Sequence, residues 1–213
     1  MGDPRFCVTM TKMRKGICNI VFDMGKVIIG FDPDIFMDRC KIFDEDDRKL
    51  IRKMIYDSPM WIQMDMGDLD EERMIENVTP LLPDHLKPHV RKLIAGWCDP
   101  LIETEDMNEL IRGLKEKGYR IYLLSNASIM QKTYWPNADC ARYFDGVVVS
   151  AFEHLMKPDE RFYQVLLNRY HLKAEECLFI DDRKNNVEAA AALGFDTYLF
   201  DGDSKALKDY IEN

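Results

Sequence analysis

The chain contains five short apolar segments, and the helical patterns that separate the last four constrain its fold more than any other feature. The segments with strand character are 17 to 23, 120 to 124, 146 to 149, 177 to 180 and 196 to 200. The first is typical of a buried parallel strand, because strands that are covered on both faces lose the alternation of apolar and polar residues. Alternating strands and helices require right-handed crossovers, so the sequence predicts an α/β fold with a parallel sheet.

The helical patterns have recognisable starts and stops. Before the second strand, apolar residues recur at helical spacing up to a stop at Gly118: Met107, Leu110, Ile111 and Leu114. A second helix is predicted to open at Pro158, and a third at Asn185 or Asn186. Each of these helices therefore lies between two strand segments that are consecutive in the sequence.

The stretch between the first strand and the helix near residue 105 is much longer than the other connections. Residues 33 to 99 contain short amphipathic pieces that prolines interrupt, a pattern typical of several short helices. The sequence predicts a small helical cap at 33 to 99, inserted into a core made of 1 to 32 and 100 to 213. Residues 1 to 15 are expected to be a loose leader.

Composition and charge exclude several classes of protein. The 213 residues carry a net charge of -9, so we expect no binding of nucleic acid and no attraction to an anionic membrane surface. No apolar run approaches the ~20 residues that span a bilayer, and no signal peptide is evident, so we expect a cytoplasmic protein. The scattered cysteines are expected to be reduced. A monomer or weak dimer is expected.

Polar residues stand at the ends of several predicted strands, where a parallel sheet would gather them at one edge. In chain order they are Asp23, Ser125, Asn126, Asp181 and Asp182, and Lys157 stands just before the helix that follows the third predicted strand. Carboxylates, a hydroxyl and a lysine in one crevice suit phosphoryl transfer. They can supply a nucleophile, ligands for a divalent metal and a cation for phosphate oxygens.

Four motifs in this order resemble the haloacid dehalogenase superfamily of phosphohydrolases. They are Phe22-Asp23-Met24-Gly25-Lys26-Val27, Leu123-Leu124-Ser125-Asn126, Met156-Lys157-Pro158 and the stretch from Phe179 to Asn186. The resemblance covers roughly residues 17 to 201. It implies a Rossmann-like sheet of strand order 3-2-1-4-5 with a helical cap at the position called C1.

Further details look like one part of the superfamily. Trp135-Pro136 and the turn Asp65-Met66-Gly67 are similar to bacterial sugar-phosphate phosphatases that act on glucose-1-phosphate. They are also similar to the phosphatase half of mammalian epoxide hydrolases. The resemblance therefore implies a phosphatase whose partner is a small phosphorylated metabolite.

The resemblance assigns a role to each residue of the motifs. Asp23 would attack phosphorus and become an aspartyl phosphate. Mg²⁺ would be held by Asp23, the backbone carbonyl of Gly25 and Asp182, with Asp181 and Asn186 acting through metal-bound waters. The phosphate would be held by three groups: the Ser125 hydroxyl, the Asn126 amide and the Lys157 ammonium, which also neutralises charge.

Gly25 departs from the pattern, because the superfamily's phosphatases usually carry a second aspartate there as general acid and base. Such assistance is worth about 10²- to 10⁴-fold, so its absence favours a substrate with a good leaving group, such as a sugar-1-phosphate. The alternative is that another group or the substrate itself supplies the proton. The glycine is expected to permit a tight turn. Candidate substrate contacts are Trp61, Met64, Asp65, Met66 and Trp135.

Three other functions stay open. Gly25 is compatible with a catalytically weakened relative that binds a phosphorylated ligand or a protein partner. A metal-independent dehalogenase would also use an aspartate nucleophile, although the pair Asp181-Asp182 argues against it. A phosphorylatable receiver module uses similar residues, but there the acidic pair precedes the phosphorylated aspartate.

Overall fold

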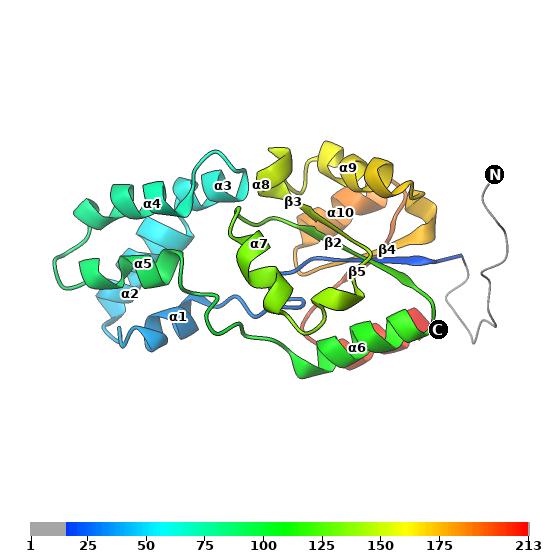
Figure 1. Ribbon diagram of the computed structural model, residues 1–213, viewed down its shortest axis with the longest axis horizontal. Helices are drawn as coiled ribbons and strands as arrows, with labels where there is room; N and C mark the ends of the chain where they lie inside the picture. Colours follow the sequence, from blue (N-terminus) through cyan, green and yellow to red (C-terminus); the bar gives the residue numbers. More distant parts are fainter. Residues whose placement is uncertain (1–15, 213) are drawn as a thin grey trace.

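The computed structural model describes residues 16–212, without the side chain of Glu105. Five parallel strands form one sheet in the order β3-β2-β1-β4-β5, which confirms the predicted fold (Figure 1). The strands are β1 (Asn19–Phe22), β2 (Arg120–Ser125), β3 (Gly146–Val149), β4 (Cys177–Asp181) and β5 (Asp196–Leu199). The predicted leader, residues 1 to 15, lies outside the described residues.

The central strand β1 fixes the register of its neighbours. Phe22, its last residue, pairs with Leu123 of β2 and Ile180 of β4. The backbone N–H of Asp23 then donates to the carbonyl of Ile180 at 2.8 Å. The residues that follow β1, β2 and β4 therefore emerge at one edge of the sheet.

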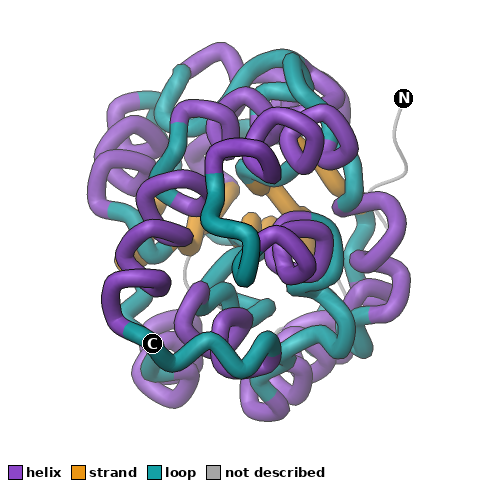
Figure 2. Tube along the Cα trace, turned by 90° about the vertical axis from the view of Figure 1, so that its left-hand side faces the viewer, coloured by secondary structure: helices purple, strands orange, loops and turns teal. Residues whose placement is uncertain are grey.

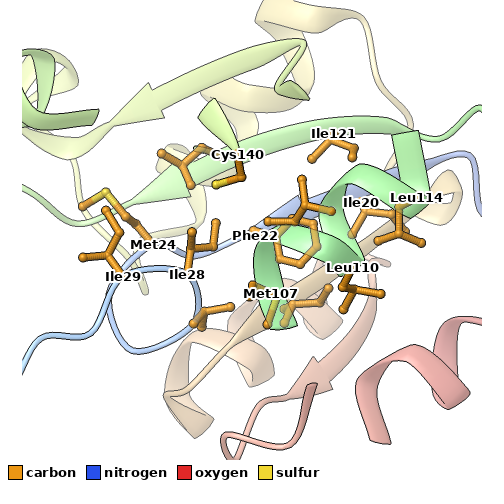
Figure 3. Packing of buried hydrophobic residues seen from close by; sticks show 14 of the residues in the cluster. Ile20, Phe22, Met24, Ile28, Ile29, Met107, Leu110, Leu114, Ile121 and Cys140 are labelled. Atoms are coloured by element: carbon orange, nitrogen blue, oxygen red, sulfur yellow. The ribbon is translucent and has the colours of Figure 1, made fainter. Parts of the chain in front are cut away.

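Helices cover both faces of the sheet because side chains along each strand alternate between two hydrophobic clusters. One face packs against α6 (Glu105–Glu116) and α11 (Ser204–Glu212), and Figure 3 shows Phe22 and Ile121 beside the α6 side chains. The other face packs against α9 (Glu160–Tyr170) and α10 (Lys184–Ala192). Two short helices, α7 (Gln131–Tyr134) and α8 (Ser150–Glu153), follow β2 and β3.

Two predicted helix starts are wrong by a few residues. Helix α9 begins at Glu160 and not at Pro158, because the Asp159 carboxylate accepts a hydrogen bond from the Arg161 N–H and caps the helix. Helix α10 begins at Lys184, one residue before the predicted range. The turn that contains Lys157 is thereby separate from the helix.

A second group of helices lies beyond the carboxyl end of the sheet and is drawn in colours from blue through cyan to green in Figure 1. Its members are α1 (Pro33–Arg39), α2 (Glu45–Ile51), a π-helical turn (Arg52–Tyr56), α3 (Pro59–Asp65), α4 (Glu71–Val78) and α5 (Val90–Ile94). They share a hydrophobic cluster of their own, from Phe36 to Ile94. Figure 2 shows these helices in front of the strands. The cap boundaries at residues 33 and 99 stay a prediction.

The remaining elements are short. Single 3-10 turns occur at Thr79–Leu81, Lys87–His89, Trp135–Asn137, Ala141–Tyr143 and Ala174–Glu176. The cysteines that the structure describes are free thiols. Within residues 16–212, no helix combines the length and the apolar character that crossing a membrane requires.

The turn after α3 rests directly on the core. The Ser150 hydroxyl donates to the backbone carbonyl of Asp65. Gly67 has a left-handed φ of +76°, and a Cβ at this position would lie 2.1 Å from the Ala151 carbonyl oxygen. The backbone can approach Ala151 this closely only because residue 67 has no side chain.

Alanine at Gly67 is expected to destabilise the protein by at least about 2 kcal/mol, because backbone strain and overpacking add there. Gly118 is the matched control: its φ is also left-handed, at +91°, but no atom lies within 4 Å of a Cβ built on it. Gly118→Ala should cost only the strain, about 1 kcal/mol. Thermal unfolding measures both variants, and equal losses would contradict the close packing of Gly67 on Ala151.

Candidate active site

Three carboxylates meet at the carboxyl edge of the sheet. Asp23 follows β1, Asp181 ends β4 and Asp182 follows it, and each offers an oxygen within 4.8 Å of the other two. Asp181 is fully buried and Asp23 is 8% exposed. Oxygen ligands gathered in this way suit a hard divalent cation such as Mg²⁺. The donor set therefore fits the metal that the sequence predicts.

Lys157 lies among these carboxylates and is itself buried. Its Nζ donates to Asp23 Oδ1 at 2.7 Å, to Asp181 Oδ2 at 2.7 Å and to the Leu124 carbonyl at 2.8 Å. These bonds employ all three N–H groups of the ammonium. Burial acts to lower the pKa of Lys157, but Asp23 and Asp181 raise it above its ordinary value. The side chain is therefore held as a cation.

The backbone of Lys157 is fixed by Asn126. The Asn126 side chain accepts from the Lys157 N–H at 2.8 Å and donates to the Lys157 carbonyl at 3.0 Å. This paired contact ties the segment after β2 to the turn before α9. The sequence predicts a phosphate contact for the Asn126 backbone amide, whereas the positioning contact of its side chain was missed.

Asp23 has an unusual ionisation. Burial raises its pKa, Lys157 opposes this rise and Asp181 adds to it, so that the pKa reaches about 6. The pKa of Asp182 is also raised, by burial first and then by Asp181. At neutral pH Asp23 is an anion, but its charged form is less stable in the folded protein than it would be in water.

Asp181 is saturated with hydrogen bonds. Besides Lys157 it accepts from the backbone N–H of Arg183 at 2.8 Å and from Asn186 Nδ2 at 3.0 Å. The predicted pair of residues acting through waters, Asp181 and Asn186, is thus brought together in direct contact. Tyr163 donates to the Asn186 carbonyl and holds the first turn of α10 in place.

Ser125 ends β2 and is 1% exposed. Among the described residues its hydroxyl oxygen has no hydrogen-bond partner. A buried hydroxyl without a partner costs about 1–3 kcal/mol, so such a group usually meets a ligand or water. This observation fits the predicted contact between Ser125 and a phosphate oxygen.

Gly25 stands in the turn that follows Asp23. The left-handed residue of this turn is Lys26, with a φ of 61°, and Gly25 has no positive φ. A Cβ at Gly25 would find no described atom within 4 Å. The turn therefore does not depend on a glycine at this position, and a side chain has room there.

A cavity of about 350 Å³ lies between the sheet edge and the helices α3, α4 and α5. Asp23, Lys157 and Asp182 line one side, and Trp61 and Asp65 line the other. Met64 also contributes, whereas Ser125, Met66 and Trp135 are not among the lining residues that the structure describes. Trp135 instead packs in the core, with its ring 5.1 Å from that of Phe144. The structure therefore does not bring Trp135 to the cavity.

The cavity also contains polar residues that the sequence analysis missed. Arg183 follows the acidic pair, and Glu71 begins α4. Ser128 of the core donates a hydrogen bond to the Glu71 carboxylate across the cavity wall. Arg183 stands within the fourth motif and could have been selected there. Glu71 carries no local signal, because an acidic residue at a helix start is common.

Comparison with known proteins places this geometry among hydrolases. The family model of haloacid dehalogenase-like hydrolases matches residues 20–194. A sesquiterpene phosphatase of Aspergillus oryzae is 26% identical over 185 residues, covering 82% of this chain and 85% of that protein. D-ribitol-5-phosphate phosphatase of Bacteroides thetaiotaomicron is 25% identical over 194 residues, covering 85% of this chain and 91% of that protein.

Longer proteins and solved structures are similar as well. Acyl-CoA dehydrogenase family member 10 of Mus musculus is 28% identical, but this chain spans only 15% of it. A haloacid dehalogenase family enzyme of Bacteroides thetaiotaomicron, solved with magnesium and inorganic phosphate, superposes with a TM-score of 0.70. It is 22% identical, and the match covers 90% of this chain and 99% of that one. The finer likeness to glucose-1-phosphate phosphatases and epoxide hydrolases stays a prediction.

Proposed function

Since the chain belongs to the haloacid dehalogenase-like hydrolases, we propose that it is a Mg²⁺-dependent phosphatase that acts on a small phosphorylated metabolite. The observation that carries the proposal is the buried contact of Lys157 with Asp23 and Asp181. A cation among carboxylates suits the binding of a phosphate dianion next to a carboxylate nucleophile. The unpartnered Ser125 hydroxyl belongs to the residue that follows Leu124, whose carbonyl Lys157 contacts.

Mg²⁺ would be held by Asp23, Asp182 and the carbonyl of Gly25. When bound, the ion would supply positive charge against the phosphate oxygens. Three carboxylates lie within 4.8 Å of one another here. They outnumber the ammonium group among them, so a further cation relieves their mutual repulsion.

The residues of the chain divide the remaining work. An Asp23 carboxylate oxygen would attack phosphorus and form an aspartyl phosphate, which water then hydrolyses. Lys157 would keep Asp23 and the phosphate together in spite of their like charges. The Ser125 hydroxyl would donate to a phosphate oxygen. Asn126 would position Lys157, because its side chain forms two hydrogen bonds with the Lys157 backbone.

The cavity supports a sugar or polyol phosphate, such as glucose-1-phosphate, as the substrate. Trp61 and Phe31 line it with rings 5.5 Å apart, and Asp65 and Glu71 add carboxyl groups. Aromatic faces accommodate the C–H surface of a sugar, and carboxylates accept hydrogen bonds from hydroxyls. A relative named as a D-ribitol-5-phosphate phosphatase favours the same class.

The proposal is tested by phosphate release from a panel of sugar, polyol and nucleotide phosphates, p-nitrophenyl phosphate and acetyl phosphate, with Mg²⁺ or with EDTA. Selective release from sugar and polyol esters that EDTA abolishes would support it. Ligand binding without release from any ester would favour the catalytically weakened alternative. Halide release from 2-haloacids that resists EDTA would favour a dehalogenase.

Mg²⁺ binding should also be visible without turnover. At about 100-fold excess of Mg²⁺ over its Kd we expect a stabilisation of about 3 kcal/mol, or a rise of about 5–10 °C in Tm for a chain of this size. Asp182→Asn should remove most of this rise. Asp84→Asn is the control, because the Asp84 side chain is 96% exposed. Equal shifts in both variants would contradict the assignment of Asp182 to the metal.

A further inference from the structure

Gly25 leaves no acid two residues after Asp23, so an alkoxide leaving group must take its proton from elsewhere. The described residues place two more carboxyl groups in the cavity that Asp23 lines: Asp65, which ends α3, and Glu71, which begins α4. Both come from the helices opposite the sheet edge. The inference drawn below rests on the proposed function, because proton supply matters only when Asp23 displaces an ester oxygen.

Hydrogen bonds separate the two candidates. The Glu71 carboxylate is engaged by the Ser128 hydroxyl, so it serves as a contact between the two groups of helices. The Asp65 carboxyl has no hydrogen-bond partner within residues 16–212, although it lines the cavity. Its proton is thus free to meet a substrate oxygen.

The backbone of Asp65 is held against the core close to the second motif. The Ser150 hydroxyl donates to the Asp65 carbonyl and accepts from the Ala127 N–H at 2.9 Å. Gly67 fixes the same turn by its close approach to Ala151. The backbone that carries the Asp65 side chain is therefore held in a fixed position, as a group that transfers a proton requires.

The surroundings of Asp65 keep its proton on near neutral pH. Burial raises its pKa, Arg183 opposes this rise, and the negative charges of Asp23 and Glu71 add to it, so that the pKa reaches about 7. Tyr134 of α7 also lines the cavity, and Asp65 contributes to the raised pKa of that phenol. A carboxyl group with a pKa near the working pH is suited to donate a proton and to accept one.

We propose that Asp65 takes the place of the acid missing at Gly25 and protonates the leaving oxygen of the substrate. As the bond between an Asp23 oxygen and phosphorus forms, the bond between phosphorus and the ester oxygen breaks, and the Asp65 proton passes to that oxygen. The resulting Asp65 carboxylate then takes a proton from the water that attacks phosphorus. This step releases phosphate and regenerates both the Asp23 carboxylate and the protonated Asp65.

Asp65→Asn tests the assignment by comparing two leaving groups. The variant should lose about 10²- to 10⁴-fold in kcat on the best sugar or polyol phosphate of the panel. It should change by no more than about threefold on p-nitrophenyl phosphate in single turnovers that are limited by phosphorylation of Asp23, because a stable phenolate leaves without a proton. Asp68→Asn is the control, since Asp68 stands in the same turn with a side chain 61% exposed.

The outcomes separate the two proposals. Equal losses on both esters would reveal a structural role for Asp65, and no loss on the alkyl ester would show that no proton comes from it; either would overturn the assignment alone. A natural chain that hydrolyses neither ester with Mg²⁺ would overturn the proposed function and this assignment together.

Gly25→Asp in the Asp65→Asn background should raise kcat on the alkyl ester by at least about tenfold. If kcat of the double variant equalled that of Asp65→Asn, this result would contradict the explanation that Asp65→Asn is slow because it has lost a proton donor.

Discussion

Replacement of Asp23 by asparagine is expected to lower phosphate release by at least about 10³-fold, because the amide cannot form the bond to phosphorus. The geometry of the site should survive. An asparagine has the shape of the aspartate, and Lys157 retains its bonds to Asp181 and to the Leu124 carbonyl. Phosphate release under saturating Mg²⁺ measures the effect, and Asp84→Asn is the matched control. Near-natural turnover by Asp23→Asn in a clean preparation would contradict its role as nucleophile.

The same variant should be more stable than the natural chain when metal is removed. The pKa of Asp23 is raised from 3.8 to about 6, so the folded state binds more protons than the unfolded state between these values. Stability that Asp23 contributes at low pH is therefore lost as the pH rises through this window. Asparagine does not ionise, so Asp23→Asn should not lose stability in this way as the pH rises. Its Tm in EDTA should therefore exceed that of the natural chain above pH 6. A lower Tm at pH 8 would contradict the desolvation of Asp23.

Replacement of Lys157 by methionine is expected to damage both activity and stability. The methionine keeps the volume, but Asp23 and Asp181 lose the cation that lies 2.7 Å from each of them. Removing one partner from a buried ion pair costs about 3–5 kcal/mol. Loss of a charge that stabilises phosphate oxygens should lower kcat by at least about 10²-fold.

Urea unfolding and phosphate release measure the two effects of Lys157→Met. The control is Lys184→Met, because the Lys184 side chain is 78% exposed and its pairing with Glu188 is 3.5 Å long. That variant should stay within about 0.5 kcal/mol of the natural chain. A stability of Lys157→Met equal to that of the control would contradict the buried, charged state of Lys157.

The sheet and its catalytic edge could be predicted because both depend on local pattern. An apolar run that stops at Asp23, and another that stops at Asp181, fix the strand ends, and parallel topology brings these ends together. The sequence places Lys157 just before the helix that follows the third predicted strand, and its motif implies a role for it. Its three contacts come from β2, from β4 and from the residue that follows β1, which no local pattern reveals.

The errors arise where tertiary packing decides. Trp135 was expected to contact substrate, yet its ring packs on Phe144 in the core. The left-handed position of the first turn falls on Lys26, which propensity alone would not select over Gly25. The cavity wall consists of residues from α3, α4 and the core. Only the structure therefore shows that Asp65 and Glu71 line the same cavity.

The most direct test of the account is the location of phosphate on the protein during turnover. We would quench the Mg²⁺-loaded natural chain with acid while it hydrolyses a sugar phosphate, and map the phosphopeptides by mass spectrometry. The account predicts a hydroxylamine-sensitive acyl phosphate on Asp23. Phosphate on another residue would contradict the account. Absence of phosphate from the natural chain, together with retained turnover by Asp23→Asn, would also contradict it.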